Sequence, residues 1–264
     1  MELFHRGDTA NELMYLNSVG PDVVTYRDEG LASNDLTFAR DYSTRAWQYI
    51  ARTYPFLSGQ RLFVTLHDGP GSGGTARNLA DDETKYRLLI DVDGDGWRET
   101  YRNRVVLTHE MGHVVEGYGS GVHGSPAFGL WGDSKWAEIF QYDVFKGLGD
   151  DADAQQWLEE KLATEDDYPV AGAHWFRDFF LPIYRDHGGT QTLVRYFDLL
   201  SKNFHQLDNE YRRDLTWGEF VHFWSGAAGV DVRPIAEAAF GWTPEWDAQL
   251  QQARVDFPGV TYTR

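Results

Sequence analysis

The chain has 264 residues, of which 42% are hydrophobic and 15% aromatic, so it can bury a full core and is not a disordered polypeptide. Its 24 basic and 41 acidic residues give a formal charge of −17, which argues against nucleic acids and anionic membranes as partners. The absence of cysteine excludes disulfides and thiolate ligands, which leaves His, Asp and Glu to hold any metal.

The N-terminal half predicts a helix followed by strands. Apolar residues recur at helical spacing over residues 36–54, and Pro55 and Gly59 end that segment. Strands are predicted at 61–66 and 85–92 from short or alternating apolar runs. The glycine-rich loop between them, HDGPGSGGT, lacks both the lysine of a phosphate-binding loop and the pattern of a nucleophile elbow, so we reject a nucleotide site and a serine nucleophile there.

The remainder of the chain, from about residue 136, predicts helices. Leu193, Phe197, Leu200 and Phe204 form one apolar stripe, and Thr216 and Glu219 have the spacing of a capping box. No segment is apolar enough to span a bilayer, so we expect no membrane insertion. We therefore predict one α+β domain over residues 1–264, with a small strand-containing lobe at 1–117 and a mainly helical lobe at 118–264.

The stretch VVLTHEMGHVVEG, residues 105–117, predicts a metal site on a helix. His109 and His113 are four residues apart, so both imidazoles lie on one helical face and can reach a single ion. Glu110 lies to the side of that face, where its carboxylate can accept a proton from water without occupying a coordination position. Catalytic zinc usually has a third protein ligand, which this helix does not provide.

Several residues are candidates for the third ligand. Glu116 lies about 10 Å along the axis from His109, too far to complete the site. A metzincin arrangement is disfavoured, because Gly119 stands where a ligand is needed and no methionine follows the helix. Glu138 lies in an apolar helix where an unpaired carboxylate is costly, so it is our first choice. The alternatives are His123 and Asp133, although Asp133 is better explained as a helix N-cap.

HEMGH, followed 25 residues after His113 by a glutamate on a second helix, resembles the gluzincin metallopeptidases, the thermolysin-like superfamily. The stretch FVHFWSGAAGVDVRPIAEAAFGW, residues 220–242, resembles the helical end of enhancin-like bacterial gluzincins. The resemblance implies a zincin-like fold, zinc held by His109, His113 and Glu138, and Glu110 as the general base for water attack on a peptide bond. It also implies a secreted enzyme whose leader is absent from the given chain.

One part of the gluzincin pattern is changed. Thermolysin-like enzymes place an aspartate that orients a histidine four residues after the glutamate ligand, but here that position is Tyr142 and the aspartate is Asp143. Both are therefore candidates to support the ligands from behind. The candidates for the residue that stabilises the oxyanion are Tyr118, His174, Tyr184 and His222, and no motif selects one of them.

A second metal is suggested by DVDGDGWRE, where Asp91, Asp93 and Asp95 alternate before Gly96, as in the first half of a calcium loop. Arg102 occupies the position where that loop needs a glutamate, and Asp-Gly between two alternating runs is also a hairpin signal. We expect the hairpin turn and keep Ca²⁺ as the alternative.

The sequence thus favours a zinc-dependent peptidase acting on a peptide or protein substrate, with zinc as cofactor. If residues 85–92 form an edge strand, an extended peptide can pair with it beside the metal. The alternatives are a zincin-fold binding module without turnover and a zinc hydrolase of a non-peptide amide.

Overall fold

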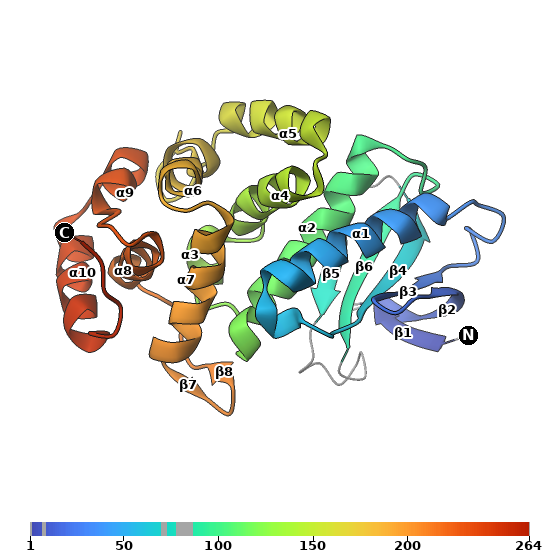
Figure 1. The fold of residues 1–264 in the computed structure, drawn as a ribbon, viewed down its shortest axis with the longest axis horizontal. Helices are drawn as coiled ribbons and strands as arrows, with labels where there is room; N and C mark the ends of the chain where they lie inside the picture. The colour runs from blue at the N-terminus through green and yellow to red at the C-terminus, as the bar shows by residue number, and fades with distance from the viewer. Residues whose placement is uncertain (1, 7–8, 70–72, 78–86, 264) are drawn as a thin grey trace. The chain divides into compact units, whose positions relative to one another are not determined.

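The computed structural model describes residues 2–6, 9–69, 73–77 and 87–263. The chain divides into two units, which we describe separately. The first consists of Met1–Tyr118 with Gly147–Gly149, and the second of Gly119–Lys146 with Asp150–Arg264. The first carries a mixed sheet and the second is mainly helical (Figure 1). The predicted α+β class is confirmed.

Six strands form the described sheet of the first unit, in the order β1-β2-β3-β4-β6-β5. The central pairs β3–β4 and β4–β6 are parallel, whereas β1–β2, β2–β3 and β5–β6 are antiparallel. The strands are β1 (Glu2–Arg6), β2 (Thr9–Val19), β3 (Val23–Arg27), β4 (Leu62–Asp68), β5 (Gly74–Arg77) and β6 (Leu88–Gly94).

The strands predicted from sequence correspond to β4 and β6, although residues 85 and 86 lie outside the described part. The condition considered for peptide pairing, an edge strand at residues 85–92, is not met by β6, because β6 lies between β4 and β5. Among the described strands, β5 forms this edge of the sheet and β1 the opposite one, and β5 comes from the end of the glycine-rich loop. Both β4 and β6 are buried over most of their length, which explains why their apolar runs were the readable signal.

Two helices of the first unit pack on this sheet. The predicted helix at 36–54 is α1 (Thr37–Thr53), which contacts β3, and α2 (Tyr101–Gly117) contacts β5 and β6. The side chain of Thr100 accepts a hydrogen bond from Asn103 N and so caps the start of α2. The hydroxyls of Tyr42 and Thr108 lie 2.7 Å apart and connect the two helices in a buried contact.

The turn after β6 differs from our expectation. Residues 91–96 do not form a hairpin, because β6 is followed by α2 rather than by an antiparallel strand. Trp97 adopts a left-handed backbone with φ of 54°, and its ring packs against Gly94, where a Cβ would lie 2.8 Å from the indole. The fully buried indole donates to the carbonyl of His67, which fixes the chain between strand and helix.

The second unit consists of helices and one short hairpin. Its predicted helices are present, including the Thr216–Glu219 capping box. Its elements are a 3₁₀ turn (Gly119–Gly121), α3 (Phe128–Trp131), α4 (Lys135–Leu148, whose end belongs to the first unit), α5 (Asp151–Ala163), a π-helical turn (Trp175–Phe180), α6 (Leu181–Asp186), α7 (Thr190–Asn203), β7 (Gln206–Leu207), β8 (Glu210–Tyr211), α8 (Trp217–Ala228), α9 (Arg233–Phe240) and α10 (Pro244–Asp256).

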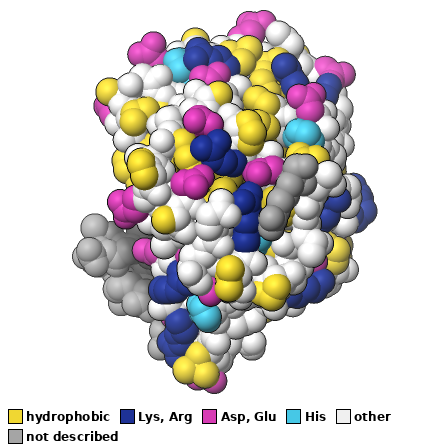
Figure 2. All heavy atoms as spheres, turned by 90° about the vertical axis from the view of Figure 1, so that its left-hand side faces the viewer, with side chains coloured by type: hydrophobic (Ala, Val, Ile, Leu, Met, Phe, Trp, Pro, Cys, Tyr) yellow, Lys and Arg dark blue, Asp and Glu magenta, His cyan; other side chains and the backbone are white. Residues whose placement is uncertain are grey.

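Aromatic rings make the core of the second unit. The rings of Tyr196 and Trp224 stack with centroids 4.2 Å apart, which joins α7 to α8. Gly218 lets α10 approach α8 closely, since a Cβ there would lie 2.1 Å from Leu250 N. Among the described residues, no helix is long and apolar enough to cross a membrane. Figure 2 shows acidic, basic and hydrophobic side chains interspersed on the face that it draws.

Candidate metal centre

The two histidines of HEMGH lie on one face of α2 with their Nε2 atoms 3.1 Å apart. Two ring nitrogens that bind one tetrahedral zinc, at about 2.0–2.1 Å each, are about 3.3 Å apart. His109 and His113 are both partly exposed, so an ion can reach them. This pair of donors fits a zinc ion, and the one-turn spacing predicted from the sequence is confirmed.

Glu116 supports the second histidine from behind. Its Oε2 lies 3.0 Å from Nδ1 of His113, and its side chain is only 3% exposed. A carboxylate on the far nitrogen fixes the ring orientation and tautomer of a metal-binding histidine and makes it more basic. Glu116 thus lies behind His113, a supporting position that was not predicted from the sequence. The signal was its spacing of three residues after His113.

Glu110 lies on the buried side of α2, with 4% of its surface exposed. It packs against β5 at Gly74, where an added Cβ would lie 2.7 Å from Cγ of Glu110 and 2.8 Å from the carbonyl oxygen of Asp91. Any side chain at this position of the edge strand would displace the carboxylate. The last glycine of the sequence GPGSGG therefore makes room for Glu110, a role that its composition did not reveal.

Glu138, our first choice for the third ligand, lies in α4 of the second unit and is 3% exposed. Its Oε1 accepts hydrogen bonds from Nζ of Lys135 at 3.4 Å and Nζ of Lys161 at 3.1 Å. Burial by itself lowers the pKa of Lys135, but the charge of Glu138 and the hydrogen bond to Asp166 outweigh it and raise that pKa. Two ammonium groups therefore face Oε1, whereas the buried Oε2 has no hydrogen-bond partner among the described residues.

The two alternatives also lie in the second unit. Asp133 is exposed in the loop between α3 and α4, directly after Gly132, whose φ is 61°. Because α4 begins at Lys135, Ser134 rather than Asp133 directly precedes the helix. His123 exchanges backbone hydrogen bonds with the β7–β8 hairpin, and its buried Nε2 has no hydrogen-bond partner among the described residues.

The residues expected to support the ligands belong to the core of the second unit. Asp143 is fully buried and accepts hydrogen bonds from the hydroxyls of Tyr184, at 2.8 Å, and Thr190. The ring of Tyr142 packs edge-on against Tyr184 and Phe176. Asp143 therefore joins α4 to the residues around α6 and α7.

The four oxyanion candidates differ in how they are held. Tyr184 donates to Asp143, and Nδ1 of His174 lies 2.6 Å from the carbonyl oxygen of Thr164. His222 has the hydroxyl of Tyr262 at 3.0 Å from one ring nitrogen and the carbonyl of Phe257 at 3.2 Å from the other. The fourth, Tyr118, packs its ring against Phe56.

The three aspartates considered as calcium ligands interact with different partners. Oδ1 of Asp91 accepts from Thr65 and lies 2.5 Å from Nε2 of the buried His67. Asp93 accepts from Gly73 N, and Asp95 pairs with Arg98. In the described chain these carboxylates do not form a group of ligand atoms close enough to share an ion. Calcium binding at this loop therefore stays a prediction, for which the carboxylates do not provide a common group of ligand atoms.

Asp91 instead helps to hold neighbouring strands together. His67 on β4 lies between Asp91 on β6 and Asp28, whose Oδ2 is 3.7 Å from Nδ1 of the ring. Asp28 also accepts from the backbone nitrogens of Leu31 and Asp68. The short contact between His67 and Asp91 therefore joins the carboxyl end of β4 to β6.

Comparison with known proteins gives no match for this chain. No model of a protein family matches the chain, and no curated protein matches it.

Proposed function

We propose that the protein is a zinc-dependent hydrolase that cleaves peptide bonds, with His109 and His113 as two ligands and Glu110 as the general base. The observation that carries this proposal is the pair of Nε2 atoms 3.1 Å apart on α2. Two further features support it: Glu116 behind His113, and the pocket that Gly74 leaves for Glu110. A helix that carried polar residues by chance would need none of these arrangements.

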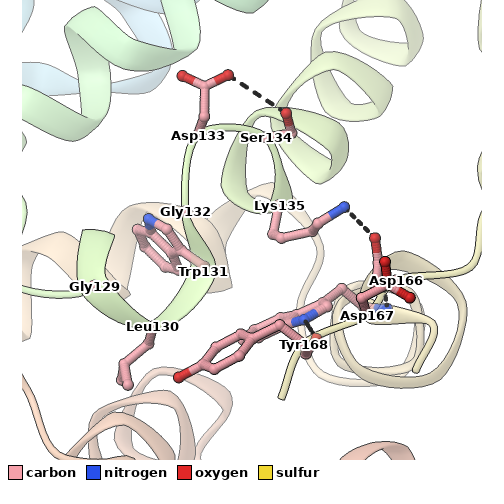
Figure 3. A pocket seen from close by; sticks show the side chains of 11 residues that line it. Gly129, Leu130, Trp131, Gly132, Asp133, Ser134, Lys135, Asp166, Asp167 and Tyr168 are labelled. Carbon is pink, nitrogen blue, oxygen red and sulfur yellow. Dashed lines mark hydrogen bonds and ion pairs between the residues drawn. The ribbon is translucent and has the colours of Figure 1, made fainter. Parts of the chain in front are cut away.

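We propose Asp133, rather than Glu138, as the third ligand. A cation at Glu138 would have to compete with two lysine ammonium groups already at its carboxylate. Asp133 offers an exposed carboxylate at the end of a glycine turn, and Figure 3 shows its oxygens directed away from Lys135 and Asp166. A carboxylate of this kind completes a His₂-carboxylate donor set typical of catalytic zinc.

When bound, zinc would supply a Lewis acid that polarises the scissile carbonyl and makes a water more acidic at neutral pH. Glu110 accepts the proton of the attacking water and passes it to the leaving amine. Its burial and its contact with β5 restrict the carboxylate to one place. Because β5 is the edge of the described sheet, an extended peptide that pairs with it would run beside Glu110.

The test is zinc content and casein cleavage of the purified parent protein and three variants: Glu110→Gln, Asp133→Asn and Glu138→Gln. We expect one zinc per chain in the parent, and cleavage that a chelator abolishes. Glu110→Gln should keep the zinc and lose about 10²–10⁴-fold in kcat. Asp133→Asn should lose most of the zinc at limiting metal, whereas Glu138→Gln should retain it.

The control is Asp151→Asn, which removes an exposed carboxylate at the start of α5 and should change neither zinc content nor cleavage. Loss of zinc in Glu138→Gln but not in Asp133→Asn would restore Glu138 as the ligand. Zinc without cleavage of casein or of a peptide library would support a binding module instead. A parent protein that binds no zinc would refute the proposal.

A further inference from the structure

A pocket in the second unit lies beside Asp133, and we propose that it binds the basic side chain, arginine or lysine, of a peptide substrate. It has a volume of about 420 Å³ and is lined by two segments and one tryptophan: Gly129–Lys135, Asp166–Tyr168 and Trp175 (Figure 3). The inference rests on the proposed function, because Asp133 both lines the pocket and is the ligand proposed there. It adds a substrate class that HEMGH cannot specify.

The charges of the lining favour a cation. With Asp133 set aside as the proposed metal ligand, the charged residues of the lining are Asp166, Asp167 and Lys135, so the formal balance is −1. Lys135 does not offset the acidic rim, because its ammonium is already shared between Asp166 and Glu138. Asp166 is likewise used, since its second oxygen accepts from Trp175 N at 3.2 Å. The exposed Asp167 is the carboxylate best placed to meet an incoming cation.

Aromatic surface supplies the second part of the site. Trp131 and Trp175 line the pocket but are nearly fully buried, so their rings are held rigidly by the core. Tyr168 is 49% exposed, and its ring is braced against Trp217 at a centroid distance of 6.1 Å. A guanidinium or ammonium group gains from lying over such a ring, and its aliphatic stem gains from apolar walls. A neutral apolar side chain would gain only the packing against the apolar walls. An acidic side chain would be repelled by the carboxylates of the lining.

Asp133 is the link between the pocket and the proposed function, because it lines the pocket and is the proposed third ligand. The net charge of −17 adds a long-range attraction for cationic peptides. A preference for basic residues would therefore act both on the association of the peptide with the protein and on its position once it is bound.

The first experiment compares cleavage of peptides that carry arginine, lysine, norleucine or glutamate in turn at the positions flanking the scissile bond. We expect kcat/KM for the arginine and lysine peptides to exceed that for norleucine by about tenfold at one position. Asp167→Asn should lower the arginine-to-norleucine ratio by about fivefold, because it removes one charge and keeps the shape. Tyr168→Leu should lower the same ratio.

The matched control is Glu165→Gln, which removes an exposed carboxylate two residues away in the same segment but outside the pocket lining. It should leave the ratio unchanged. A preference for norleucine or glutamate in the parent would overturn the proposal, as would an equal fall of the ratio in Glu165→Gln and Asp167→Asn.

A binding measurement separates this inference from the proposed function. N-acetyl-arginine amide and N-acetyl-norleucine amide are titrated into Glu110→Gln, with and without Asp167→Asn, and followed by tryptophan fluorescence. Tighter binding of the arginine compound that Asp167→Asn weakens supports the pocket even if the parent cleaves no peptide. Cleavage of peptides by the parent, with equal binding of both compounds, would refute the pocket and leave the peptidase intact.

Discussion

At the scale of single residues, the site shows how a buried polar group gains a defined role from its partner. Glu116 and Glu138 are equally buried glutamates on helices, but one faces an imidazole and the other faces two ammonium groups. The first arrangement would support His113 as the proposed metal ligand, and the second places two positive charges beside the carboxylate. Exposure alone does not distinguish them.

The position of Glu116 leads to a prediction about zinc affinity. Glu116→Gln keeps the size of the side chain but removes the charge that supports His113, so zinc should bind about 10–100-fold more weakly. Competition with a chromophoric chelator at pH 7 measures the change. Glu99→Gln, at a 77% exposed carboxylate just before α2, is the control and should bind zinc as the parent does. Unchanged affinity in Glu116→Gln would mean that the contact does not support a metal ligand.

At the scale of elements, the start of α8 combines a capping box, which is local in the sequence, with an ion pair that stabilises its glutamate. The Thr216–Glu219 capping box was readable from spacing, but the ion pair of Glu219 with Arg213 was not. Burial by itself raises the pKa of Glu219. The hydrogen bonds from Arg213 and from the backbone and side chain of Thr216, together with the charge of Arg213, outweigh burial and hold the pKa below its ordinary value of 4.5.

This depressed pKa predicts a stability effect with a definite sign. Because folding lowers the pKa, ionised Glu219 stabilises the protein above the ordinary value of 4.5, and this stabilisation is lost as pH falls through the folded-state pKa. Glu219→Gln should cost about 1–2 kcal/mol at pH 7. The difference from the parent should shrink as the pH is lowered below about 4.

Urea unfolding at pH 7 and at successively lower pH measures this difference. Glu237→Gln, which removes a half-exposed partner of Arg233 on α9, is the control and should show a much smaller effect at pH 7. An equal cost for Glu219→Gln at every pH would contradict the assignment to an ionised carboxylate.

At the scale of the whole molecule, a bound metal should increase the free energy of unfolding. A ligand that binds only the folded chain stabilises it by about 2.7 kcal/mol at a free concentration one hundred times its Kd. Zinc should therefore raise Tm of the metal-free protein, a chelator should reverse the rise, and His109→Ala should abolish it. Scanning calorimetry provides the measurement. A zinc-dependent rise of the same size in His109→Ala would place the metal elsewhere.

The prediction from sequence was most accurate where neighbouring residues carry the information. The i, i+4 histidines, the helix at 36–54 and the capping box were all found, because each depends on the spacing of residues within a few turns. The strands β1, β2, β3 and β5 were not predicted, although Val23 and Val24 form the start of a buried strand. An apolar run this short carries little periodicity.

The sequence by itself determined the α+β class, the helix that presents His109 and His113 on one face, and the place of Glu110 beside them. Tertiary structure alone decided that β5 rather than β6 is the sheet edge, that Lys161 neutralises Glu138, and that Asp91 turns to His67. The physical reason is the range of the interaction. Helical spacing is set by consecutive residues, whereas ion pairs and strand order depend on where distant segments return in the folded chain.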